Sequence, residues 1–161
     1  MQAHDAPDHS PAPPPLRPDA SPVRPAGGAR PAPPSSASAQ RVLVIEDDIE
    51  GAAALALTLE MLGYAVRQVH DGAHAVAAAL EFRPDAILSD IDLPHRDGFE
   101  LAQAFADDPA FRHTPIIALT GRVDRDEWIA ALESGFTRFL AKPATPDELA
   151  ALLAELLAPR Q

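Results

Sequence analysis

The chain has no cysteine and no long run of apolar residues. Without cysteine, disulfide bonds and thiolate chemistry are excluded, and the composition fits a reducing compartment. No apolar stretch approaches the length of a bilayer-spanning helix, and no apolar segment of a secretory signal follows the first residues. We therefore expect a cytoplasmic protein that is not inserted into a membrane.

Basic residues are also scarce. The sequence has 13 Lys and Arg against 24 Asp and Glu, for a formal net charge of -11. Nucleic-acid binding needs clustered Lys and Arg side chains that contact phosphates, so direct binding to DNA or RNA is disfavoured. A glycine-rich phosphate loop of the dinucleotide or Walker type is absent from the sequence too, which disfavours nucleotide binding.

Residues 1–40 differ in composition from the remainder. They contain eleven of the eighteen prolines and very few strongly apolar residues. Such a segment cannot bury enough surface to offset the entropy lost on ordering, and it is predicted to be a disordered tail. The remaining chain is long enough for one ordinary domain. We place that domain at residues 41–158, with 159–161 as a short end.

From residue 41 onward, strand-like and helix-like segments alternate. Gly63 and Gly135 are suited to ending helices, and Thr145 followed by Pro146 is a favourable helix start. The periodicity predicts five strands and five helices. The strands are expected at residues 42–45, 64–69, 86–89, 116–119 and 136–141, and the helices at 49–62, 72–82, 98–106, 124–134 and 146–157.

This alternation predicts an α/β fold, a parallel sheet with helices on both faces. Right-handed crossovers restrict it to a few doubly wound strand orders. In the helix at 124–134, Ile129 and Leu132 are predicted to face inward. Trp128 is predicted to join them in the core instead of forming a binding surface.

Polar residues stand at the ends of four predicted strands. They are Glu46 and Asp47, Asp90, Thr120 and Lys142. The carboxyl ends of parallel strands share one edge of the sheet, so these side chains are expected to meet. Carboxylates that lie close together repel unless a cation neutralises them, and their oxygens suit Mg²⁺ or Mn²⁺. An aspartate beside such a metal, a lysine and a hydroxyl can attack phosphorus and form an acyl phosphate.

The order of the motifs resembles the response-regulator receiver domain of two-component signalling over residues 41–158. The resemblance implies a flavodoxin-like fold, a doubly wound five-stranded parallel sheet with strand order 2-1-3-4-5. The matching motifs are Val-Ile-Glu-Asp-Asp at 44–48, Ser-Asp-Ile-Asp-Leu-Pro at 89–94 with Asp-Gly at 97–98, Ala-Leu-Thr-Gly at 118–121 and Phe-Leu-Ala-Lys-Pro at 139–143.

The resemblance implies a role for each acidic residue. Asp90 would accept the phosphoryl group. Mg²⁺, or Mn²⁺ in its place, would be bound by Asp47, Asp90 and the backbone carbonyl of Asp92, with Glu46 acting through a metal-bound water. Asp48 falls outside this set and is expected to begin the first helix.

Three further positions take roles from the same resemblance. Lys142 would bridge the acceptor carboxylate and a phosphoryl oxygen, and the Lys142-Pro143 bond would be cis. Thr120 and Phe139 would form a switch pair, in which the hydroxyl moves toward the phosphoryl group and the ring packs into the vacated space. Phe139 lacks the hydroxyl of the commoner tyrosine, so this switch would work by packing alone.

The implied function is that of a phosphoacceptor in a two-component system or phosphorelay. The phosphoryl group would come from a histidine kinase or a histidine phosphotransfer protein, docked near the first helix and the Asp90 loop. The chain would signal through protein–protein contacts and, with only residues 158–161 left after its last helix, without an output domain. It would catalyse its own phosphorylation and autodephosphorylation, not substrate turnover.

Two alternatives and one refinement stay open. Asp90 and Asp92 also resemble the nucleophile and acid/base pair of haloacid-dehalogenase-type phosphohydrolases, although those enzymes carry their metal acids downstream of the nucleophile. A receiver-shaped binding module that is never phosphorylated is disfavoured by the intact acidic set. At the rim, where His95-Arg96 replaces the smaller residues usual in the family, Asp92 and Arg122 are hypothesised to pair and slow hydrolysis of the acyl phosphate.

Overall fold

The computed structural model describes residues 39–94, 97–121 and 124–159, without the side chain of Glu127. The chain divides into two units, Met1–Ala37 and Ser38–Gln161, and the description below concerns the second. The predicted tail, His95-Arg96 and the Asp92–Arg122 pair lie wholly or partly outside the described residues.

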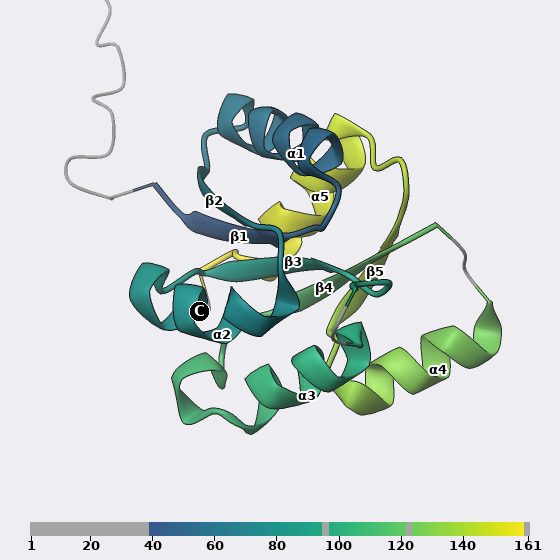
Figure 1. The fold of residues 1–161 in the computed structure, drawn as a ribbon. Helices are drawn as coiled ribbons and strands as arrows, with labels where there is room; N and C mark the ends of the chain where they lie inside the picture. Colours follow the sequence, from purple (N-terminus) through teal and green to yellow (C-terminus); the bar gives the residue numbers. More distant parts are fainter. Residues whose placement is uncertain (1–38, 95–96, 122–123, 160–161) are drawn as a thin grey trace, which may run out of the picture. The chain divides into compact units, whose positions relative to one another are not determined.

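The centre of the unit is a parallel sheet with strand order β2-β1-β3-β4-β5 (Figure 1). This order confirms the doubly wound, flavodoxin-like arrangement expected from the sequence. The non-consecutive neighbours β1 and β3 are joined through a crossover, as parallel pairing requires. The strands are β1 (Arg41–Ile45), β2 (Ala65–Val69), β3 (Ala86–Asp90), β4 (Ile116–Thr120) and β5 (Arg138–Ala141).

Helices cover both faces of the sheet. Figure 1 shows α1 and α5 on one face and α2, α3 and α4 on the other. A short 3-10 helix, η1 (Pro109–Phe111), precedes β4 and was not predicted. The α-helices are α1 (Ile49–Met61), α2 (Gly72–Phe82), α3 (Gly98–Asp107), α4 (Arg125–Ser134) and α5 (Pro146–Leu156). None of those that lie within the described ranges is long and apolar enough to cross a membrane.

Each central strand contributes to two cores because successive side chains point to opposite faces. In β1, Val42 and Val44 pack toward α1 and α5, whereas Leu43 and Ile45 pack toward α2 and α3. All five residues of β3 are buried. This double burial explains why the central strands read as continuous apolar runs instead of alternating with polar residues.

Helix ends follow the sequence signals. Gly63 and Gly135 have positive φ angles of 100° and 117°, a backbone conformation that side chains disfavour. Thr145 and Glu148 form a capping box at the start of α5, and Pro146 occupies the first turn. The predicted stops and the predicted start are therefore confirmed.

The prediction that α4 buries its large apolar residues is wrong. Trp128, Ile129 and Leu132 are 47%, 45% and 45% exposed, and the small residue Ala131 is fully buried. The helix lies beside α3 at the end of its layer (Figure 1). Its contact with the core therefore rests on a small residue, and much of its apolar surface stays in solvent.

Candidate functional site

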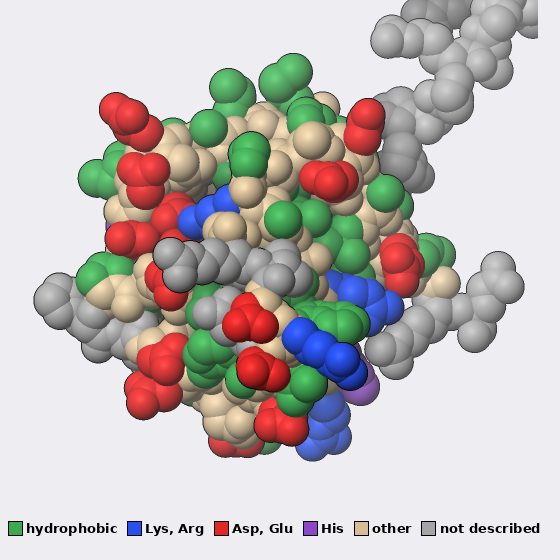
Figure 2. Space-filling view, turned by 90° about the vertical axis from the view of Figure 1, so that its right-hand side faces the viewer, with side chains coloured by type: hydrophobic (Ala, Val, Ile, Leu, Met, Phe, Trp, Pro, Cys, Tyr) green, Lys and Arg blue, Asp and Glu red, His purple; other side chains and the backbone are tan. Residues whose placement is uncertain are grey.

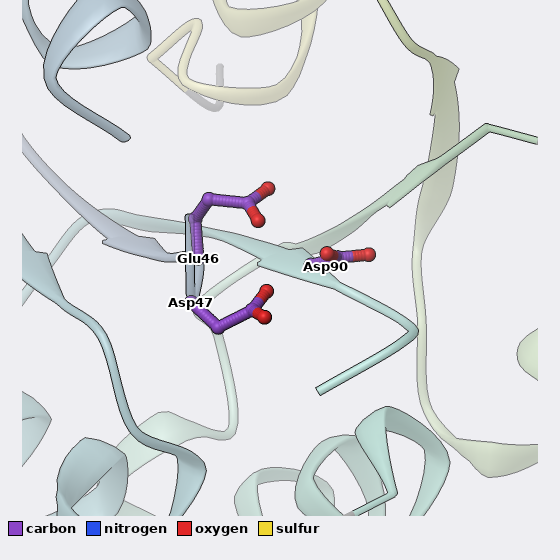
Figure 3. A group of neighbouring side chains, drawn as sticks. All are labelled: Glu46, Asp47 and Asp90. Carbon is purple, nitrogen blue, oxygen red and sulfur yellow. The ribbon is translucent and has the colours of Figure 1, made fainter. Parts of the chain in front are cut away.

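Three acidic side chains converge where β1 and β3 end. One carboxylate oxygen from each of Glu46, Asp47 and Asp90 lies within 4.8 Å of the others. The two strands are parallel neighbours, with Ile45 paired to Ser89, so the next residues of both strands meet. Figure 3 shows Glu46 and Asp47 leaving β1 with their carboxylates directed toward Asp90.

Two of the three carboxylates are buried. Glu46 is 5% exposed and Asp90 is 6% exposed, while Asp47 faces solvent. The backbone N–H of Glu46 donates to the Val69 carbonyl at 3.0 Å, which extends the sheet into the site. Burial raises the pKa of the Glu46 carboxyl above its ordinary value, the hydrogen bond from Lys142 offsets part of this, and the Asp90 charge adds to it.

Lys142 connects the two buried carboxylates. Its Nζ donates to Glu46 Oε2 at 2.5 Å and to Asp90 Oδ2 at 3.0 Å. Its backbone N–H donates to the Thr120 carbonyl, and the Lys142-Pro143 peptide bond is cis, as the resemblance led us to expect. Burial alone would lower the pKa of Lys142, but the bonds and charges of Glu46 and Asp90 outweigh it and raise that pKa.

The loop after β3 is fixed against the start of α3. The Asp92 backbone N–H donates to Asp90 Oδ1 at 3.1 Å, and the Gly98 N–H donates to the Ile91 carbonyl at 3.1 Å. A Cβ atom at Gly98 would lie 2.6 Å from the Ile91 carbonyl oxygen and 2.8 Å from that of Asp90. Glycine at this position therefore lets the helix start close beside the acidic loop. The Asp92 side chain is exposed.

The remaining two residues of the predicted set lie on β4 and β5. Thr120 ends β4 and is 3% exposed. Ala118 is paired with Phe139, so Thr120, two residues further along β4, faces the same side of the sheet as Phe139. Phe139 is partly buried and contacts the rings of Phe136 and Trp128.

Sequence reasoning missed a hollow of about 450 Å³ beside Lys142 and Glu46. It lies between α1 and the loop that joins β5 to α5. Its walls include Gly51, Ala54 and Pro143. Gly51 and Ala54 lie three residues apart on one face of α1, where their small size leaves a depression in the helix surface. This spacing is the sequence signal that could have indicated the hollow.

The donor set fits a small divalent cation. Glu46, Asp47 and Asp90 offer hard carboxylate oxygens within reach of one another, whereas Lys142 supplies a single positive charge. Magnesium and manganese prefer such oxygen ligands. Figure 2, turned to face the side where the strands end, shows acidic side chains spread over this face and fewer basic ones. The surroundings therefore favour attraction of a cation.

Comparison with known families gives a match over most of this unit. The family model for the response regulator receiver domain matches residues 42–154. The acidic cluster, Lys142 and Thr120 all lie inside this range.

Characterised relatives match the same part of the chain. The DNA-binding response regulator MtrA of Mycolicibacterium paratuberculosis is 35% identical over 112 residues, 70% of this chain and 48% of the relative. The transcriptional regulatory protein PrrA of Mycobacterium leprae is 38% identical over 120 residues, 74% of this chain and 51% of the relative. The chain thus spans about half the length of these relatives.

Solved structures agree. Chemotaxis protein CheY4 of Vibrio cholerae is similar with a TM-score of 0.71 and 31% identity, covering 74% of this chain and 99% of that one. The receiver domain of sensor histidine kinase PA1611 from Pseudomonas aeruginosa gives a TM-score of 0.70 and 34% identity, covering 76% and 100%. The latter structure contains a magnesium ion coordinated in its active-site cleft.

Proposed function

The chain belongs to the response regulator receiver domain family, and on this premise we propose that Asp90 accepts a phosphoryl group from a histidine kinase or a histidine phosphotransfer protein. One observation carries the proposal. The Asp90 carboxylate is buried at the end of β3, bonded to the Lys142 ammonium and grouped with two further carboxylates. An isolated aspartate at the end of a strand would have neither the lysine partner nor the neighbouring carboxylates.

The proposed transfer moves one group between two proteins. A carboxylate oxygen of Asp90 bonds to phosphorus, the bond from phosphorus to the imidazole nitrogen of the donor breaks, and its electron pair returns to the imidazole. Lys142 offsets the negative charge on the phosphoryl oxygens, and the Thr120 hydroxyl donates to one of them. Attack by water on the acyl phosphate then releases phosphate and restores the Asp90 carboxylate.

Magnesium is the proposed cofactor, with manganese as a substitute. Asp47, Asp90 and the Asp92 backbone carbonyl would hold it directly, and Glu46 would act through a bound water. The ion would supply positive charge that stabilises the transferring oxygens. The acidic cluster and the magnesium-bound receiver from Pseudomonas aeruginosa support this assignment.

The histidine protein is proposed to dock over α1 and the loop after β5. The hollow between these elements opens beside Lys142 and Glu46, so a side chain docked there would lie near the acceptor. Ile49 and Leu57 on α1 are 66% and 59% exposed and offer apolar contact area. The sequence contains no cysteine, a composition that fits a reducing compartment, so we also propose a cytoplasmic location.

Signal output is proposed to pass through protein–protein contacts. DNA binding is named for MtrA, and the chain covers about half of that relative. Acidic side chains are spread widely over the face shown in Figure 2, and their negative charge disfavours contact with phosphates.

The test is incubation with acetyl phosphate and Mg²⁺, followed by intact mass measurement. We expect one phosphoryl group on the parent chain, and none after chelation of the metal or in Asp90→Asn. Asp92→Asn is the matched control, because that side chain is exposed and only its backbone belongs to the proposed site. Labelling that persists in Asp90→Asn, or catalytic turnover of a small phosphate ester, would overturn the proposal.

A further inference from the structure

The backbone of Glu46 is bonded to the end of β2 through both its N–H and its carbonyl. Ile45 and Val69 are the last paired residues of β1 and β2. Beyond them, the Glu46 N–H donates to the Val69 carbonyl at 3.0 Å, and the Glu46 carbonyl oxygen lies 3.0 Å from Nδ1 of His70. The His70 side chain therefore continues the link between the two strands past the end of their pairing.

The contact fixes which nitrogen of the His70 ring donates. A carbonyl oxygen offers only lone pairs, so it accepts the hydrogen bond and Nδ1 must carry the proton. Nε2 is then the unprotonated nitrogen of the neutral ring. The bond thus needs a donor at one position of the side chain, and Nε2 takes no part in it.

The Glu46 carbonyl belongs to the peptide group that also contains the Asp47 N–H. A peptide group is planar, so fixing its carbonyl fixes the direction in which the chain enters Asp47. The Glu46 side chain is separately held by Lys142 and by the Asp48 N–H, whereas the Asp47 side chain is exposed. The direction of the Asp47 carboxylate therefore depends more on the backbone before it than on packing around it.

We propose that His70 is a positioning residue for the acidic cluster. Its Nδ1–H holds the Glu46–Asp47 peptide in the orientation that directs the Asp47 carboxylate toward Asp90, the arrangement seen in Figure 3. Among the described residues, the ligand atoms that gather within 4.8 Å belong to Glu46, Asp47 and Asp90, so His70 acts through Asp47 and not as a ligand. The inference rests on the proposed function, because Asp47 would bind the cation that assists transfer to Asp90.

His74 offers a matched comparison four residues further along the chain. Its Nδ1 lies 3.1 Å from Oδ2 of Asp71, and both side chains are exposed. Asp71 is the N-cap residue of α2 and accepts a hydrogen bond from the Ala73 N–H at 2.9 Å. The His74 contact thus concerns the start of a helix, so His74→Leu controls for the loss of an exposed histidine without loss of the bond to Glu46.

Calorimetric titration of the full chain with Mg²⁺ tests the positioning role. His70→Leu removes the donor, and we expect the dissociation constant for Mg²⁺ to rise by about two- to tenfold, the equivalent of one hydrogen bond. His70→Asn should restore the parent affinity, because its amide nitrogen is attached to Cγ as Nδ1 is. His70→Gln carries its nitrogen one bond farther out and should bind as weakly as His70→Leu. His74→Leu should bind as the parent does.

Two further measurements separate positioning from a purely structural role. Initial rates of phosphorylation by acetyl phosphate are measured over a range of Mg²⁺ concentrations, and urea unfolding is measured without Mg²⁺. In His70→Leu we expect a higher half-saturating Mg²⁺ concentration with an unchanged rate at saturation. A lower urea midpoint combined with the parent Mg²⁺ affinity would overturn the proposal, and so would weak Mg²⁺ binding that His70→Asn does not restore.

Nitrogen NMR of the histidine rings gives a readout that needs no metal. In the neutral form of the parent, we expect the proton of His70 on Nδ1. A proton on Nε2 alone would contradict the bond to the Glu46 carbonyl and overturn the proposal.

The outcomes also distinguish this proposal from the function on which it rests. If the parent is phosphorylated and His70→Leu keeps its Mg²⁺ affinity, the positioning role is wrong while the proposed function stands. If the variants follow the expected order of Mg²⁺ affinity but Asp90 is not phosphorylated, the proposed function is wrong while the positioning role stands. If the parent binds no Mg²⁺, both are wrong.

Discussion

The Nζ atom of Lys142 lies 3.0 Å from Oδ2 of Asp90, and the same ammonium donates to Glu46. The lysine follows β5 and the aspartate ends β3, so the bond reaches past β4, which lies between them in the sheet. One cation is thus shared by two buried carboxylates, while Asp47 adds a third acidic group nearby. The site holds more negative than positive charge, and this imbalance governs how its variants should behave.

Replacing Lys142 with Met should destabilise the fold. The change leaves Glu46 and Asp90 facing each other without their shared donor, an arrangement that costs free energy in a buried site. Because 35% of the lysine side chain is exposed, water screens part of this cost. We expect the free energy of unfolding to fall by about 1–3 kcal/mol. Urea unfolding followed by circular dichroism measures it, and an unchanged midpoint would count against the shared-donor description.

Replacing Asp90 with Asn should not lower the free energy of unfolding and should tend to raise it. The Asp90 charge is one of the causes that raise the pKa of Glu46, so removing it relieves repulsion between two carboxylates. We expect the free energy of unfolding without Mg²⁺ to stay the same or rise by up to about 1 kcal/mol. The same urea titration checks this. A clear loss of stability would show that Asp90 supports the fold as well as its proposed chemistry.

Replacing two adjacent aspartates with Asn should affect magnesium affinity differently. Asp47 belongs to the acidic cluster, whereas Asp48 is the N-cap residue of α1 and lies outside it. We expect Asp47→Asn to weaken Mg²⁺ binding by about tenfold or more, and Asp48→Asn to change it little. Calorimetric titration of both variants with Mg²⁺ gives the comparison. Equal affinities in the two variants would contradict the assignment of Asp47 as a ligand.

The parallel sheet and the acidic cluster could be predicted because both follow from local patterns, whereas the strand order was implied only by the resemblance to receiver domains. Apolar runs separated by helical periodicity specify a parallel sheet, and the carboxyl ends of its strands must share an edge. The Asp90 and Glu46 positions are then set by where each run stops. The positions of both residues at one edge of the sheet therefore follow from the sequence alone.

The exposure of α4 could not be predicted in this way. Whether Trp128 is buried depends on which face of α4 meets α3, and helical periodicity leaves that orientation open when a helix has apolar residues on several sides. The bond from Lys142 to Glu46 likewise joins residues far apart in the sequence. Contacts of this kind depend on how the helices and loops pack, so only the folded structure shows them.

Tyr64 should contribute to the loss of stability at high pH. It packs partly buried beside the core under α1 and α5, and burial raises the pKa of its phenol above 10.0. The unfolded chain therefore loses this proton before the folded protein does, so stability is complete below the unfolded pKa and falls as pH rises through the folded one. Between about pH 9 and pH 11, Tyr64→Phe should lose less stability than the parent. Urea midpoints at several pH values measure the difference, and parallel curves would contradict it.

Gly98 should be the least replaceable glycine near the site. A Cβ atom there would lie 2.6 Å from the Ile91 carbonyl oxygen and 2.7 Å from Ile91 Cα, and backbone atoms cannot rotate away as a side chain does. We expect Gly98→Ala to lower the free energy of unfolding by about 1–3 kcal/mol, through displacement of α3 from the acceptor loop. It should also slow phosphorylation of Asp90, because the loop that carries the acceptor moves with the helix. Gly121→Ala is the matched control, since a Cβ atom at that glycine meets nothing within 4 Å. Thermal unfolding and intact mass measurement on both variants test the prediction, and equal behaviour of the two would show that the close approach at Gly98 does not constrain the loop.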